Sequence, residues 1–101
     1  MGGTAVMIQN DDTRDSIAPQ IAMDATGTAI AVWMQSDFNG DNIWANRFDG
    51  ASWGTAELVE ADSAGTASSP QIAMDGTGKA VAVWYQGCLI LDNIWANQFG
   101  F

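Results

Sequence analysis

Asp37, Asn39 and Asp41 carry side-chain oxygens at alternate positions of the segment SDFNGD. Oxygen ligands at the first, third and fifth positions are typical of a calcium-binding loop. The glycine expected after Asp41 is replaced by Asn42, and no bidentate glutamate stands at the twelfth position. The pattern therefore favours a hydrophilic turn over a calcium site, and we expect neither a bound metal nor a cofactor.

A second group of side chains has the chemistry to bind a sugar. Arg47 offers hydrogen-bond donors, Glu57 offers acceptors, and Trp53 offers a flat ring on which a sugar can stack. Asp37 and Asn39 lie in a predicted loop, where binding residues often gather. These five residues form the predicted ligand-binding set.

Residues suited to catalysis are scarce. The chain has no histidine, so Cys88 has no imidazole partner with which to form a reactive thiolate. Asp24 and Asp75 have the chemistry of a glycosidase carboxylate pair, but each opens a predicted tight turn, which is an ordinary role of aspartate. We expect a protein that is not an enzyme, and a hydrolase using carboxylates and calcium is the less favoured alternative.

Composition narrows the class of protein further. The 101 residues suit one small domain, and the apolar content of 48% is that of a globular protein. Three basic and twelve acidic residues give a net charge of −9, which argues against nucleic acid and anionic membrane surfaces as partners. The start, MGGTAVMIQNDD, lacks the pattern of a signal peptide. The sequence indicates no particular compartment.

An internal repeat with an offset of 51 residues organises the chain. Residues 19–50 and 70–101 are identical at 20 of 32 aligned positions, including the motifs PQIAMD and DNIWAN. Such similarity predicts two copies of one structural unit. Four of the five tryptophans recur at equivalent positions, which favours a place in the core: Trp33 with Trp84, and Trp44 with Trp95. Gln98 replaces Arg47, so a sugar site that uses Arg47 would occur once per chain.

Each unit is predicted to form four short β-strands, at residues 19–24, 28–35, 42–48 and 53–60 in the first copy. No segment has helical periodicity or helix caps. The strand at 28–35 is apolar on both faces, which predicts a sheet that is covered on both sides. Four-stranded sheets of about 50 residues that stack on their own copies are β-propeller blades. The fold class is therefore predicted as an all-β propeller.

The order of the unit resembles NHL-type propeller repeats: a Pro-led strand ending in Asp, a Gly turn, an apolar strand, a loop, an Asn-led strand and a weaker outer strand. This resemblance implies that PQIAMD is the innermost strand and that residues 53–60 are the outermost. The two-blade organisation is similar to that of small bacterial and fungal fucose-binding lectins, some of which build six-bladed propellers from two-blade chains. The similarity lies in the architecture and does not extend to their binding motif.

The outer strand of the second copy is expected at the other end of the chain. Gly3-Thr4-Ala5 aligns with Gly54-Thr55-Ala56 at the same offset. The predicted organisation is an outer strand at 3–9 donated to a neighbouring chain, a complete blade at 19–60 and a three-stranded blade at 70–99. The predicted interface comprises Gly3, Thr4, Ala5, Val6, Met7 and Ile8 of the donated strand, and Ile94, Ala96 and Gln98 of the receiving strand.

Two blades cannot close a ring, so we expect a cyclic homo-oligomer. A six-bladed trimer is favoured, and a dimer and a tetramer are the alternatives. The predicted function is that of a non-enzymatic binding module, lectin-like in that carbohydrate is its ligand. The alternative is a structural or protein-interaction ring, in which the apolar loop GCLIL (87–91) contacts a partner.

Overall fold

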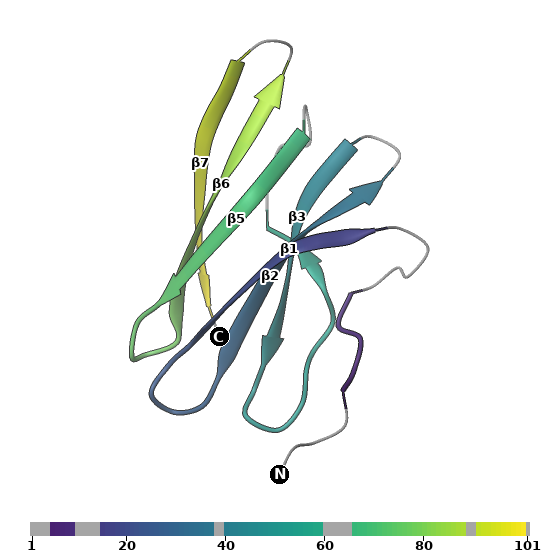
Figure 1. Cartoon of the computed structure of the whole chain (residues 1–101). Coiled ribbons are helices and arrows are strands. Elements are labelled where there is room, and N and C mark those ends of the chain that lie inside the picture. Colours follow the sequence, from purple (N-terminus) through teal and green to yellow (C-terminus); the bar gives the residue numbers. More distant parts are fainter. Residues whose placement is uncertain (1–4, 10–14, 38–39, 60–65, 89–90, 101) are drawn as a thin grey trace.

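The computed structural model describes residues 5–9, 15–37, 40–59, 66–88 and 91–100 of the chain. Every regular element in these ranges is a β-strand, and the strands form two antiparallel sheets (Figure 1). The predicted all-β class is confirmed. The first sheet has the order β1 (Ser16–Met23), β2 (Ala29–Asp37), β3 (Gly40–Phe48), β4 (Glu57–Leu58). The second has the order β5 (Thr66–Met74), β6 (Lys79–Cys88), β7 (Leu91–Gly100).

The repeated sequence gives the two sheets the same register. Trp33 lies opposite Trp44 in the first sheet, and Trp84 lies opposite Trp95 in the second. Each first strand has a register shift just before the glutamine of PQIAMD, and the residue before the proline has positive φ in both cases, 56° at Ala18 and 52° at Ser69. The shared PQIAMD motif is therefore preceded by the same strand irregularity in both copies, although the residues just before the proline differ.

The fourth strand differs from its prediction, whereas the strand predicted at residues 3–9 was expected to pair only with a neighbouring chain. The fourth strand is shorter than residues 53–60, because after a bridge from Trp53 to Phe48 the ladder resumes only at Glu57. Gly54 lies in the interruption, and a glycine puts no side chain on the sheet to stabilise pairing. Residues 5–9 pair with none of the described strands of their own chain.

Each sheet has two faces, which we name after their residues. The tryptophan face carries Trp33 in the first sheet and Trp84 in the second. The opposite face is the valine face, which carries Val32 in the first sheet and Val83 in the second. The tryptophan face of the second sheet packs on the valine face of the first. The resulting core contains Ile30, Val32, Ile43, Ala45 and Val59 of the first sheet, and Ala67, Ala80, Ala82 and Trp84 of the second.

The tryptophan face of the first sheet lies against residues 5–9. Asn46 donates from its side-chain amide to the carbonyl oxygen of Ile8, and Met7, Ile8, Ala31 and Trp33 line a common hollow. In Figure 1 this purple segment lies on the side of the first sheet that faces away from the second sheet. The first sheet is thus covered by the second sheet on its valine face, whereas on its tryptophan face residues 5–9 cover only a part, and Ile21 and Met23 remain exposed there.

Candidate functional site

Arg47 and Glu57, two of the predicted sugar-binding residues, come together as an ion pair. They lie on adjacent strands of the first sheet, since Glu57 is opposite Ala45 in the pairing of β3 with β4. A hollow of about 130 Å³ beside them is completed by Val59 and by Asn97 of the second sheet. The hollow therefore brings a guanidinium, a carboxylate and an amide together at the junction of the two sheets.

Trp53 does not belong to this group. It bridges to Phe48, and the two rings lie 5.4 Å apart between centroids at an angle of 48°. Phe48 pairs with Ala29 and so lies on the tryptophan face, whereas Arg47 pairs with Ile30 on the valine face. The structure therefore places the predicted stacking ring on the face opposite the ion pair.

Asn97 was absent from the predicted set, although the structure gives it a specific role. Its side-chain amide donates to the carbonyl oxygen of Val59 over 2.6 Å, which links the second sheet to the end of β4. Asn46, 51 residues earlier, makes the equivalent bond to Ile8 over 3.0 Å. The signal in the sequence was the last letter of DNIWAN, which is kept in both copies.

The calcium candidate is only partly within the described residues. Asp41 accepts a hydrogen bond from Ser36 Oγ over 2.6 Å, which ties the two strands of the hairpin together. Asp37 lies opposite Gly40, but its side chain and the whole of Asn39 lie outside the described part of the structure. Among the described residues, no group of three or more cysteine, histidine or acidic side chains gathers as a metal site would require.

Asp24 and Asp75 serve their turns, as the sequence predicts. Asp24 Oδ1 accepts from the backbone amides of Thr26 and Thr28, and Asp24 Oδ2 accepts from Thr28 Oγ1 over 2.6 Å. The Thr28 and Thr26 hydroxyls stabilise the carboxylate and lower the pKa of Asp24 to about 2. The pKa of Asp75 is lowered too, first by the Thr77 hydroxyl. These hydrogen bonds give both carboxylates a structural role in their turns.

The described residues of the predicted interface are largely apolar and exposed. On the N-terminal segment, Ala5, Val6 and Met7 are exposed and Ile8 is half-buried. On β7, Ile94, Ala96 and Gln98 are exposed. Gly3 and Thr4 lie outside the described residues, as do residues 89–90 of the apolar loop.

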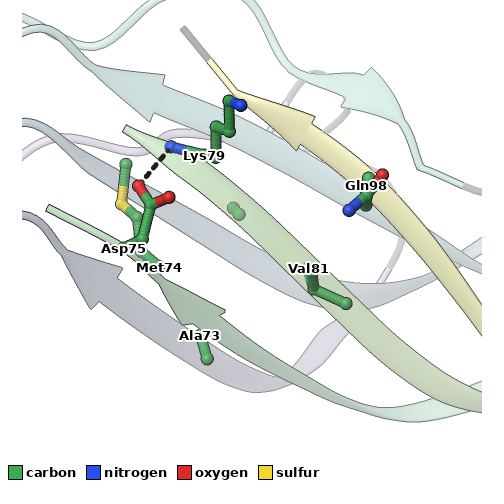
Figure 2. A pocket seen from close by; sticks show the side chains of 7 residues that line it. Ala73, Met74, Asp75, Lys79, Val81 and Gln98 are labelled. Atoms are coloured by element: carbon green, nitrogen blue, oxygen red, sulfur yellow. Dashed lines mark hydrogen bonds between the residues drawn. The ribbon is translucent and has the colours of Figure 1, made fainter. Parts of the chain in front are cut away.

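The valine face of the second sheet is hollowed near its first turn. Ala73, Val81 and Gln98 line this hollow of about 570 Å³, and Figure 2 shows them beside Met74, Asp75 and Lys79. The dashed line in Figure 2 is the bond of 3.0 Å from the Lys79 amide to the Asp75 carboxylate. The hollow is thus an open apolar surface with a hydrogen-bonded turn at its rim.

Within the described ranges, no helix is long and apolar enough to cross a bilayer. No family model, no curated protein and no solved structure matches this chain. Its function therefore has to be inferred from its own residues and geometry.

Proposed function

We propose that this chain is a self-assembling β-propeller module, in which copies stack their sheets as blades of a closed ring. The ring is a non-enzymatic binding module. The observation that carries the proposal is the contrast between equivalent residues on the two valine faces. Val32 and Ile43 are 0% exposed against the second sheet, whereas their counterparts Val83 and Ile94 are 37% and 67% exposed.

The valine face of the second sheet is exposed, although its apolar composition is typical of a protein core. Val81, Val83 and Tyr85 of β6 and Ile94 of β7 are all exposed side by side. Contiguous apolar patches on a protein surface mark interaction sites. Because the equivalent surface of the first sheet binds a tryptophan face, the surface that best fits this patch is the tryptophan face of another copy.

An unpaired strand edge supports the same proposal. β3 is covered by β4, whereas in the described structure β7 pairs with β6 alone. An open edge of ten residues offers free backbone groups to another strand. Repeated head-to-tail contacts of one kind between copies generate a ring when the rotation closes.

Three copies would give six blades, within the range of about 4–8 blades found in propellers. Light scattering tests the ring, and we expect a mass about three times the 10.7 kDa of one chain. Small-angle scattering or electron microscopy should then show a disc with a central channel. A folded particle with the mass of a single chain contradicts the proposal.

We propose carbohydrate as the ligand, because the hollow beside Arg47, Glu57 and Asn97 combines the donors and acceptors that bind sugar hydroxyls. A glycan array tests this with Arg47→Gln as the matched variant, since Gln98 is the natural residue at the equivalent position. We expect the wild type to bind a sugar and the variant to lose that binding. Absence of binding to every sugar at millimolar concentration leaves the protein-interaction ring as the function.

A further inference from the structure

We propose that residues 5–9 of one copy form the fourth strand of the second sheet of another copy, with Met7 opposite Trp95 and Val6 opposite Ala96. The inference rests on the proposed function and names the partner surface and the register. The partner is a second copy of this chain. Its docking surface consists of the valine face of the second sheet together with the free edge of β7.

The first argument is the pair of hydrogen bonds at the ends of the outer segments. Asn97 of the second sheet binds the carbonyl oxygen of Val59, which directly follows β4 of the first sheet. Asn46 of the first sheet binds the carbonyl oxygen of Ile8 in the same way. Residues 5–9 thus occupy, relative to the first sheet, the place that the end of β4 occupies relative to the second sheet.

This placement indicates which sheet residues 5–9 belong to. β4 completes the first sheet, whose valine face packs against the tryptophan face of the second sheet, the face that carries Asn97. By the same geometry, residues 5–9 complete a sheet whose valine face packs against the tryptophan face of the first sheet, the face that carries Asn46. No sheet of the described chain stands there. The segment therefore already lies beside the tryptophan face of the first sheet, on which the valine face of a second copy would pack, and it needs no large rearrangement to pair with that copy.

The register follows from the pairing of β3 with β4. Leu58 lies opposite Trp44, and Glu57 lies opposite Ala45. Moved by 51 residues, the same pairs become Met7 with Trp95 and Val6 with Ala96. Val6, Met7 and Trp95 are exposed large apolar residues in the single chain. Pairing would cover all three, and Met7 would shield the Trp95 ring as Leu58 lies beside Trp44.

The two faces that would meet, the tryptophan face of the first sheet and the valine face of the second, have complementary shapes. Ile21 and Met23 stand on the tryptophan face of the first sheet and are 59% and 60% exposed, while their counterparts Ile72 and Met74 pack against the core. In a second copy, the hollow lined by Val81 and Gln98 lies where such side chains would be received. Ridges of one copy would thus fill the hollow of the other.

One polar pair distinguishes this interface from the internal one. Among the described residues, Ser16 Oγ is a buried hydroxyl oxygen without a hydrogen-bond partner, and Ser16 lines a hollow of about 250 Å³ on the tryptophan face. Its counterpart Ala67 belongs to the core against which Met34 packs. Tyr85 is the counterpart of Met34 and is exposed. A second copy would bring the Tyr85 hydroxyl into this hollow in place of an apolar contact, and the Ser16 hydroxyl, which is buried in the single chain, would rotate towards it.

Disulfide cross-linking between two chains tests the register. In a Cys88→Ala background, Val6→Cys and Ala96→Cys are made in separate chains, which are then mixed and oxidised. We expect a covalent dimer only in the mixture, because facing Cα atoms of antiparallel strands lie within disulfide range. One chain with both substitutions should give a covalent ladder that ends at the ring size. An Ala45→Cys/Glu57→Cys chain is the positive control, since that pair is formed internally.

Gln98→Cys mixed with Val6→Cys is the matched negative control. Position 98 is two residues along β7 on the same face, and diagonal neighbours lie beyond disulfide range. Loss of the cross-link in this control, with its presence at position 96, supports the register. An assembled oligomer that cross-links at neither position, or equally at both, overturns the register and leaves the ring proposal intact. A monomer overturns both.

Tyr85→Phe and Ser16→Ala provide a second measurement that does not depend on cross-linking. Each variant should weaken self-association by roughly two- to tenfold, the effect of one hydrogen bond. The double variant should be no weaker than either single variant, because both remove the same bond. Sedimentation at several protein concentrations measures this coupling. Independent, additive effects of the two substitutions overturn the pairing of Ser16 with Tyr85.

Discussion

The side-chain amide of Asn46 donates a hydrogen bond of 3.0 Å to the carbonyl oxygen of Ile8, and so holds the N-terminal segment on the first sheet. Asn46 is buried, and its Oδ1 also accepts from the Arg47 amide over 2.8 Å. We predict that Asn46→Ala lowers the free energy of unfolding by about 1–3 kcal/mol, because it leaves buried partners unsatisfied. Urea unfolding at one fixed protein concentration measures this loss.

Asn97→Ala is the matched variant for that experiment. Its bond to Val59 is equivalent, but its side chain is exposed, so water can replace the lost partner. The expected loss is about 0.5–1.5 kcal/mol. A larger loss of unfolding free energy for Asn97→Ala than for Asn46→Ala would contradict the inference that the more buried hydrogen bond, that of Asn46, stabilises the chain more.

Val83→Lys should separate folding from assembly. Val83 is partly exposed in the single chain, so lysine there should change the stability of that chain by no more than about 0.5 kcal/mol. The charge would nevertheless have to be buried when a second copy docks on this face, so we expect a monomer by light scattering. Circular dichroism should remain that of a folded β-protein.

Val32→Lys is the control at the equivalent position of the first sheet. Val32 is fully buried between the two sheets, and an unpaired charge there should cost about 3–5 kcal/mol. We expect this variant to be unfolded rather than monomeric and folded. If Val83→Lys still assembles like the wild type, the valine face of the second sheet is not the docking surface.

Gly76 and Gly27 should respond in opposite ways to alanine. A Cβ at either glycine meets no atom within 4 Å, but Gly27 has a φ of 92°, which L-residues rarely adopt. Gly27→Ala should therefore destabilise the chain by about 1–2 kcal/mol. Gly76→Ala, which copies the natural Ala25 of the first turn, should stabilise it by about 0.4–1 kcal/mol. Thermal unfolding distinguishes the two signs.

Asp24 should make stability depend on pH in the acid range. Its pKa is about 2 in the folded chain against an ordinary value of 3.8, so the unfolded chain binds more protons between these values. The stabilisation by this carboxylate is fully present above pH 3.8 and is lost as the pH falls towards 2. Thr28→Val removes the first cause of the lowered pKa, so the pKa of Asp24 should rise.

Carbon-detected NMR titration of the aspartate carboxyl groups measures that change. Asp75, whose pKa is lowered first by its own Thr77, serves as the internal reference and should not move. An unchanged pKa at Asp24 in the Thr28→Val variant would show that the hydroxyl bond of 2.6 Å does not stabilise the carboxylate.

Several features of the fold and the candidate site could be read from single segments of sequence. Asp24 was correctly predicted to open a turn, because the hydrogen bonds of its carboxylate reach residues only two and four positions away. The placement of Trp53 was not predictable in the same way. Its face depends on the bridge to Phe48 and on the interruption of the strand that follows. Asn46 was overlooked because its partner Ile8 lies 38 residues away.

The sequence by itself determined the first three strands of each sheet, the turns and the equivalence of the two sheets, since these follow from apolar alternation, short-range hydrogen bonds and the 51-residue repeat. Only the tertiary structure decided which face of each sheet is covered. Val32 and Val83 have the same neighbours in sequence, yet one is buried and the other is exposed. Their burial is decided by a second surface brought from far along the chain, and local sequence does not specify that surface.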